Sequence, residues 1–387
     1  MNQRTIQILF ALLRSAIRGT ALTEEERNCI TQDLIRDILK ISCKHDMAHL
    51  VGFGLMQNEL ISENRDSLQQ CIFAAVYRYE QINYEFENLC AALEKAKIQF
   101  LPLKGSVIRK YYPEAWMRTS CDIDILIRHE DLYRAISYLA DHHHYIVKEY
   151  ATHDVSLFSP SGIHVELHFD LVEEGRAQNA IDVLKTVWEN VVLHENSEYW
   201  YEMADDYFYF YHIAHMAKHF ENGGCGIRPF IDLWILDHVV KVDRAACDYL
   251  LNKGNLLKFA NASRALRDMW FEGDAPDALS LQMQDFLLHS GVYGSADNRV
   301  ALQQKNKGGR IGYLLSRMFV PYVKLKRYYP VLEKYRWLMP VMQVRRWFML
   351  LKPDVAKMAK AELAANSAVD ATYAAQMGEF LKKIGLQ

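Results

Sequence analysis

Residues 118–127 read Arg-Thr-Ser-Cys-Asp-Ile-Asp-Ile-Leu-Ile, a stretch in which two acids alternate with aliphatic side chains. In a β-strand, side chains two positions apart lie on the same face of the sheet. Asp122 and Asp124 therefore point together, and the isoleucines beside them face the opposite layer. The pattern predicts a strand that aims two carboxylates at one cation, although an exposed surface strand can carry the same spacing.

Short strand patterns on both sides of this stretch predict a small mixed sheet. The apolar run 98–103 leads into Lys104-Gly105-Ser106, which indicates a strand, a tight turn and a short helix. After the acidic strand, a helical period is followed by three runs with strand character. The helix is expected over residues 130–141 and the three strands over 145–149, 154–158 and 163–171.

Helical periodicity dominates the rest of the chain, both before residue 98 and from residue 178 to the end. The predicted fold class is therefore α+β, with a small mixed sheet embedded between helical regions. The expected domains are an N-terminal helical region (1–97), an α/β core (98–177), a helical domain (178–300) and a basic amphipathic helical region (301–387).

Composition places the chain among ordinary soluble globular proteins. It has 387 residues, half of them apolar, and seven cysteines without C-x-x-C spacing, which we expect to be free buried thiols in a reducing compartment. The N-terminal apolar stretch is interrupted by Arg14 and Arg18, which fits an amphipathic helix better than a signal peptide. No apolar run is long enough for a spanning helix, so a cytoplasmic location is expected.

Charge is distributed unevenly along the chain. Residues 305–352 hold twelve lysines and arginines and a single acid, Glu333, a local balance of plus eleven within a net charge of −3. Aromatic side chains are interleaved with these cations. An internal helical layer with extended basic side chains and a peripheral contact with the anionic inner membrane surface both fit this pattern, whereas a nucleic-acid partner is not favoured.

A third acid, Glu166, lies in the strand expected over 163–171 and is flanked by aliphatic residues, as the two aspartates are. If the two strands are neighbours, three carboxylates meet and repel one another, and a divalent cation is the natural compensation. Oxygen ligands favour Mg²⁺ or Mn²⁺, which can hold a triphosphate and activate an acceptor hydroxyl. The sequence thus predicts phosphoryl or nucleotidyl transfer.

These residues resemble the DNA polymerase beta-like nucleotidyltransferase superfamily, whose signature is a Gly-Ser turn, an alternating D-x-D strand and a later acidic strand. More narrowly, the chain resembles a bacterial family of uncharacterised nucleotidyltransferases. The motifs that carry this resemblance are Leu103-Lys104-Gly105, Tyr112-Pro113, Met117-Arg118, Asp122-Ile-Asp124-Ile-Leu126, Val165-Glu-Leu-His168, His215, Gly226-Ile-Arg228 and Asp232.

The resemblance implies a nucleotidyltransferase core at 98–177 and an enzyme that moves an NMP group from an NTP to an acceptor hydroxyl, with release of pyrophosphate. It implies metal-binding and catalytic roles for Asp122, Asp124 and Glu166. The residues expected to bind the nucleotide are Lys104, Gly105, Ser106, Arg118, His215 and Arg228. The acceptor could be a small molecule, a protein or a glycan, and no pattern indicates it, the nucleotide base or the oligomeric state. A noncatalytic scaffold of the same fold is the alternative function.

Several of these residues have a purely structural alternative. Ser106 could cap its helix instead of contacting phosphate, and Arg118 could pair with the aspartates. Arg228 has the spacing of a helix salt bridge with Asp232, and His215 that of a packed helix residue. The run His164-Val-Glu166-Leu-His168 also allows a zinc site, although no fourth ligand with zinc-like spacing follows it.

Overall fold

The computed structural model of the chain describes residues 2–60, 65–172, 178–292, 294–329, 331–349 and 353–386. The chain divides into two compact units. The first unit comprises Met1–Lys218 with Ile227–Leu288, and the second comprises His219–Gly226 with His289–Gln387. The predicted domain boundary at residue 177 and Lys352 of the basic segment lie outside the described residues.

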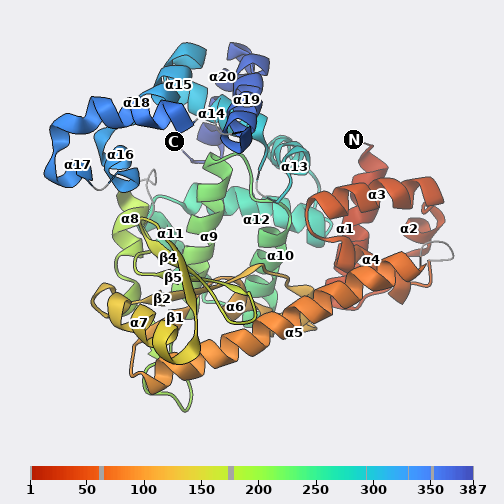
Figure 1. Cartoon of the computed structure of the whole chain (residues 1–387). Coiled ribbons are helices and arrows are strands. Elements are labelled where there is room, and N and C mark those ends of the chain that lie inside the picture. Colours follow the sequence, from red (N-terminus) through yellow and green to blue (C-terminus); the bar gives the residue numbers. More distant parts are fainter. Residues whose placement is uncertain are drawn as a thin grey trace. The chain divides into compact units, whose positions relative to one another are not determined.

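Five helices form the N-terminal part of the first unit, as the sequence predicts (Figure 1). Thr23 and Glu26 form a capping box at the start of the second of them. Gly54 allows the first and fourth helices to approach closely, because a Cβ there would lie 2.6 Å from the carbonyl oxygen of Leu12. The helices are α1 (Gln3–Arg18), α2 (Glu24–Asn28), α3 (Gln32–Lys44), α4 (Ala48–Gln57) and α5 (Arg65–Lys95).

A five-stranded mixed sheet follows, in the order β1-β2-β5-β4-β3. The central pair β2 and β5 is parallel, and the other neighbouring pairs are antiparallel. The predicted α+β class and mixed sheet are therefore confirmed. The strands are β1 (Phe100–Pro102), β2 (Asp122–Ile127), β3 (Ile146–Tyr150), β4 (Asp154–Phe158) and β5 (His164–His168).

The two faces of this sheet differ in chemistry. Alternate aliphatic residues of the three central strands are fully buried in a core that also contains apolar residues of α5 and of α7 (Leu132–His143). The intervening positions carry acids and histidines on β2 and β5. The alternation of β2 and β5 thus directs one set of side chains into the core and leaves the polar set on the opposite face.

A hairpin interrupts the helices after residue 178, where the sequence predicted only helices and the breaks between them, so that prediction is wrong for residues 191–203. Its strands, β6 (Val191–Leu193) and β7 (Tyr201–Met203), are antiparallel. The backbone N–H of Phe100 donates to the carbonyl of Tyr199 over 2.9 Å, and the Phe100 and Trp200 rings lie 5.7 Å apart. The hairpin therefore covers the exposed edge of β1. Strands of three residues are too short to show a period of two.

The remaining elements of the first unit are helical. The turn after β1 leads into α6 (Gly105–Ile108), and α9 (Asp205–Glu221) continues from the hairpin. The others are η1 (Arg109–Tyr111), η2 (Ala115–Met117), η3 (His129–Asp131), α8 (Gln178–Leu184), η4 (Val187–Glu189), α10 (Arg228–Ile235), the π-helix η5 (Leu236–Val240), α11 (Arg244–Lys253), α12 (Leu257–Phe271) and α13 (Ala278–Ser290).

The second unit consists of helices around a small core of its own. Val300, Ala301 and Tyr313 pack there against Val369 and Ala374. Among the described residues, no helix combines the length and the apolar character needed to cross a bilayer. The helices are α14 (Ala296–Asn306), α15 (Gly309–Met318), α16 (Tyr322–Tyr328), α17 (Val331–Lys334), η6 (Arg336–Leu338), α18 (Met339–Met349), α19 (Pro353–Ala368) and α20 (Ala371–Lys383).

The seven cysteines carry free thiols, in keeping with their irregular spacing. Cys90, Cys225 and Cys247 are buried. Cys43 and Cys121 are exposed, so the prediction that all the thiols are buried is wrong. Cys43 lies in the last turn of α3, and Cys121 lies in the connection before β2, where the backbone has not yet entered the sheet.

Candidate active site

The pairing of β2 with β5 brings the predicted acids together. The strands run parallel, with Asp122 opposite His164 and Asp124 opposite Glu166. Residues that are paired in this way on neighbouring strands share one face of the sheet. The structure therefore places the three carboxylates on the same face, opposite the isoleucine core. Their catalytic roles stay predictions.

Ligand atoms on this face form two overlapping groups. One oxygen or nitrogen each from Asp122, His164 and Glu166 lie within 4.8 Å of one another. The same holds for Asp124, Glu166 and His168. Glu166 belongs to both groups, so these residues could hold one metal ion or two neighbouring ones.

Asp124 lies between two cationic side chains. Its Oδ1 is 2.7 Å from Nζ of Lys104 and 2.9 Å from Nε2 of His168, which is also 3.3 Å from Oε2 of Glu166. Burial alone would raise the pKa of Asp124, but Lys104 and the His168 hydrogen bond hold it well below its usual value. Burial likewise opposes the charge of Lys104, yet Asp124 raises the lysine pKa. Asp124 is therefore ionised and charge-balanced.

Asp122 has the opposite electrostatic character. Burial, together with the charges of Asp124 and Glu166, raises the pKa of Asp122, although Lys104 and His164 act in the other direction. A carboxyl group whose pKa is raised by neighbouring acids lies in a region of negative potential. Binding of a cation beside Asp122 would relieve that repulsion, so the electrostatics of this end of the site also fit a metal.

His168 gives this site a pH-dependent contribution to stability. Burial lowers its pKa, but hydrogen bonds with Asp124 and Glu166 outweigh burial and raise the pKa to about 9. In the unfolded chain, the pKa of His168 has its ordinary value of about 6.5. The stabilisation is therefore fully present below about pH 6.5 and is lost as the pH rises through about 9. With a chelator present, we expect denaturant midpoints to fall across that window and to fall less in His168→Gln. A midpoint that is constant from pH 6 to 9.5 in the unaltered protein would contradict this assignment.

The turn between β1 and α6 holds Lys104 in an unusual backbone conformation. Its φ of 48° and ψ of −121° lie outside the common regions for a residue with a side chain. Such strain is frequent at functional sites, where neighbouring structure maintains it. The alternative that Ser106 caps the helix is wrong, because α6 begins one residue earlier, at Gly105, and Lys104 occupies the cap position.

Arginine side chains surround Gly105. A Cβ on Gly105 would lie 3.4 Å from Nη1 of Arg118 and 3.7 Å from Nη2 of Arg109. Arg109 also donates to the carbonyl of Gly105 over 2.9 Å and to Oγ of Ser120 over 2.7 Å. Burial and the charge of Arg118 lower the pKa of Arg109 to about 10, so it remains a cation at neutral pH. Sequence reasoning missed Arg109, which no motif distinguished from an ordinary helix residue.

Arg118 forms a buried bidentate ion pair with Asp232. Its Nε and Nη2 lie 2.7 and 2.8 Å from the two carboxylate oxygens, and the Tyr112 hydroxyl donates to Oδ1 over 2.7 Å. Asp232 therefore pairs with Arg118, whereas Arg228, the alternative partner on the same helix, contacts Asp46. A phosphate contact by Arg118 stays a prediction, as does a nucleotide contact by Arg228.

His215 lies on α9, one helical turn beyond Tyr211, and the two rings are 6.3 Å apart. Tyr211 is close enough to Lys104 to raise its pKa. Helix α9 thus runs beside the turn that carries Lys104, and His215 continues along the same helix face. The nucleotide contact that is expected of His215 stays a prediction.

A third group of possible ligands on the same sheet was missed. Asp154, the first residue of β4, is paired with His168, and its Oδ1 lies 3.3 Å from Nε2 of His153. Ligand atoms of these three residues lie within 4.8 Å of one another. The sequence shows strand character at Asp154 but does not reveal that β4 lies beside β5. The sequence also allowed a zinc site with His164 and His168 as ligands. These two histidines belong to different groups of possible metal ligands.

Comparison with known proteins gives one family match and two negative results. A family model described as "Uncharacterised nucleotidyltransferase" matches residues 32–272, more than half of the chain. The matched segment contains the sheet and all the predicted site residues. No curated protein and no solved structure matches the chain.

Proposed function

Because the chain belongs to the uncharacterised nucleotidyltransferase family, we propose that it transfers an NMP group from an NTP to an acceptor hydroxyl. Asp122, Asp124 and Glu166 would hold Mg²⁺ or Mn²⁺. The observation that carries the proposal is the pair of overlapping ligand groups that share Glu166 on one sheet face. A divalent cation bound there would neutralise the triphosphate and polarise its α-phosphorus.

The reaction assigns a task to each part of the site. The acceptor oxygen bonds to the α-phosphorus, the bond from that phosphorus to the bridging oxygen breaks, and pyrophosphate leaves. Glu166, on the polar face beside Asp124, accepts the proton of the acceptor hydroxyl. Lys104 and the arginines around Gly105 supply positive charge for the polyphosphate. The acceptor is a hydroxyl of a small molecule, a protein or a glycan.

A binding experiment distinguishes this function from that of a noncatalytic scaffold. We expect each productive NTP to bind in calorimetry only when Mg²⁺ or Mn²⁺ is present, because the acids otherwise repel the triphosphate. Incubation with that NTP and a cell extract should then release pyrophosphate and give an NMP-bearing product that mass spectrometry detects. Glu166→Gln should remove product formation, and the matched change Glu149→Gln on exposed β3 should not.

Two results would count against catalysis. Triphosphate binding that is unaffected by a chelator would separate the acids from nucleotide recognition. Metal-dependent binding without any pyrophosphate release, over a range of extracts, would favour the scaffold function.

A further inference from the structure

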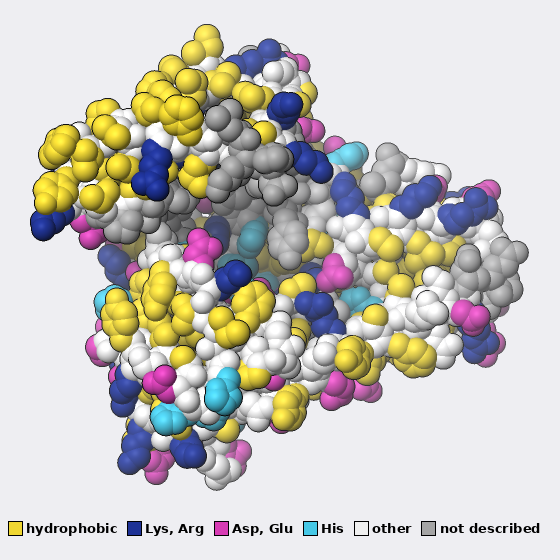
Figure 2. Space-filling view, in the orientation of Figure 1, with side chains coloured by type: hydrophobic (Ala, Val, Ile, Leu, Met, Phe, Trp, Pro, Cys, Tyr) yellow, Lys and Arg dark blue, Asp and Glu magenta, His cyan; other side chains and the backbone are white. Residues whose placement is uncertain are grey.

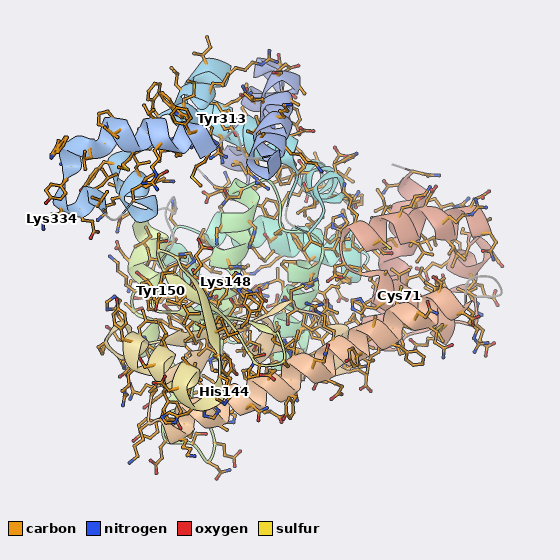
Figure 3. All side chains as sticks on the ribbon, viewed as in Figure 1. Cys71, His144, Lys148, Tyr150, Tyr313 and Lys334 are labelled. Carbon is orange, nitrogen blue, oxygen red and sulfur yellow. The ribbon has the colours of Figure 1, made fainter. Side chains whose placement is uncertain are left out.

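Helix α15 in the second unit exposes its apolar side. Ile311, Leu315 and Met318 follow one another at helical spacing and are 74%, 50% and 44% exposed. Tyr313, on the opposite side of the helix, is buried in the core of this unit (Figure 3). The helix therefore uses one face for its own core and presents a second apolar stripe to the outside.

Helix α18 shows the same arrangement with greater contrast. Val341, Val344 and Phe348 form an outward stripe and are 54%, 43% and 66% exposed. The inward side includes polar side chains, since Gln343 is buried and donates to the carbonyl of Val320 over 2.5 Å. Arg346, also on that side, donates to the carbonyl of Met318 over 2.9 Å. A helix of a water-exposed surface normally has the reverse polarity.

These two stripes belong to a larger apolar surface. Of the 24 large hydrophobic residues that are exposed among the described residues, twelve lie within 311–349. Figure 2 shows hydrophobic side chains gathered over α15 and α16–α18, with basic side chains among them. Trp337, 74% exposed, is the largest of these residues. We call the six outward residues of α15 and α18, together with Trp337, the apolar surface.

Many basic residues belong to the same segment of the chain as the apolar surface. The segment 305–352 carries twelve basic residues and one acid, and Lys334 extends from the end of α17 in Figure 3. The guanidinium of Arg336 lies 4.5 Å from the centre of the Tyr322 ring, and that of Arg345 lies 5.5 Å from the Tyr329 ring. Cations and aromatic rings therefore occupy the same short helices as the exposed aliphatic residues.

We propose that the apolar surface binds a bilayer that contains anionic phospholipid, with α15 and α18 lying in the plane of the interface. Apolar stripes would enter the boundary between head groups and acyl chains, and the basic residues would contact lipid phosphates. Trp337 and the tyrosines have the amphipathic rings that are enriched at this depth.

Charge is the reason that a bilayer suits this surface better than a protein partner. Protein interfaces are depleted of lysine at their centres, whereas this segment carries twelve basic residues interspersed among its apolar ones. A second copy of the chain would bring a balance of plus eleven against the same charge, which opposes self-association. An anionic lipid bilayer offers negative head groups for the basic residues and an acyl layer for the apolar residues.

Sedimentation of the full chain with vesicles tests the proposal. We expect binding to phosphatidylglycerol–phosphatidylcholine vesicles, little binding to phosphatidylcholine alone, and a decrease as salt rises from 0.05 to 0.5 M. Trp337→Ser combined with Phe348→Ser should weaken the binding by at least about tenfold. The control, Tyr84→Ser combined with Tyr133→Ser, removes rings of comparable exposure, 66% and 72%, from the first unit and should leave binding unchanged.

A charge variant, Lys334→Gln with Arg336→Gln, should weaken binding by roughly tenfold at low salt and by less at high salt. Circular dichroism of each variant verifies the fold. Absence of sedimentation by the unaltered protein, or equal binding to neutral vesicles at every salt concentration, would overturn the proposal. Concentration-dependent dimerisation that the Trp337 and Phe348 changes abolish, without vesicle binding, would also overturn it and identify a second copy as the occupant.

Discussion

Asp124→Asn should lower NMP transfer by roughly a thousandfold or more. Asp124 is an ionised carboxylate of the proposed metal site, because Lys104 and His168 both contact its Oδ1. An amide has nearly the same shape but neither the charge nor the affinity of a carboxylate for a divalent cation. The rate of pyrophosphate release with saturating NTP and metal measures the loss.

Controls for this variant follow from the electrostatics of the site. Asp124→Asn removes the charged partner of Lys104 and leaves His168 with Glu166 alone, so some loss of stability accompanies the loss of activity. Asp122→Asn avoids that problem, because it removes a carboxylate whose pKa is raised by burial and neighbouring acids. It should abolish transfer without destabilising the fold. Asp141→Asn, on the exposed surface of α7, should leave the rate unchanged. Full activity of both site variants, with the fold intact, would refute the proposed metal ligands.

Asp232→Ala should lower the free energy of unfolding of the first unit by about 3–5 kcal/mol. The side chains of Arg118 and Asp232 are only 11% and 2% exposed and form two hydrogen bonds. Removing one member leaves a buried guanidinium without its counterion and also deprives the Tyr112 hydroxyl of its acceptor. Urea denaturation, followed by circular dichroism, measures the change.

A surface ion pair supplies the matched comparison. Asp33 and Arg36 form a pair on α3 whose side chains are 86% and 68% exposed, and Asp33→Ala should change stability by less than about 1 kcal/mol. Arg118→Lys should lower the free energy of unfolding by an amount between those of these two variants. The lysine keeps the positive charge but cannot form the two parallel hydrogen bonds of the guanidinium. Equal denaturation midpoints for Asp232→Ala and Asp33→Ala would show that the buried pair does not stabilise the unit.

The sheet and its polar face could be predicted from the sequence because both depend on local periodicity. Alternation in 122–127 and 164–168 identifies two strands and the side of each that is polar. The likeness of the two patterns, together with the family resemblance, was enough to predict that Glu166 accompanies the aspartates.

Contacts between distant segments could not be predicted in this way. The Arg118–Asp232 pair joins residues that are 114 positions apart, and no period in either segment indicates it. Asp154 joins the site only because β4 follows β5 in the sheet order. The hairpin β6–β7 was missed because each of its strands has only three residues, too few to show a period of two.

The parallel pairing of β2 with β5 also determines which register of the two strands can fold into a stable core. A shift of one residue would turn Glu166 toward the isoleucine layer and expose Val165 and Leu167 to water. Burying a carboxylate among aliphatic side chains is strongly unfavourable, so a misaligned sheet cannot close over α5 and α7. The alternation of acids and aliphatic residues therefore disfavours any other register of the two strands. A chain that has formed this core already has its three acids on one face.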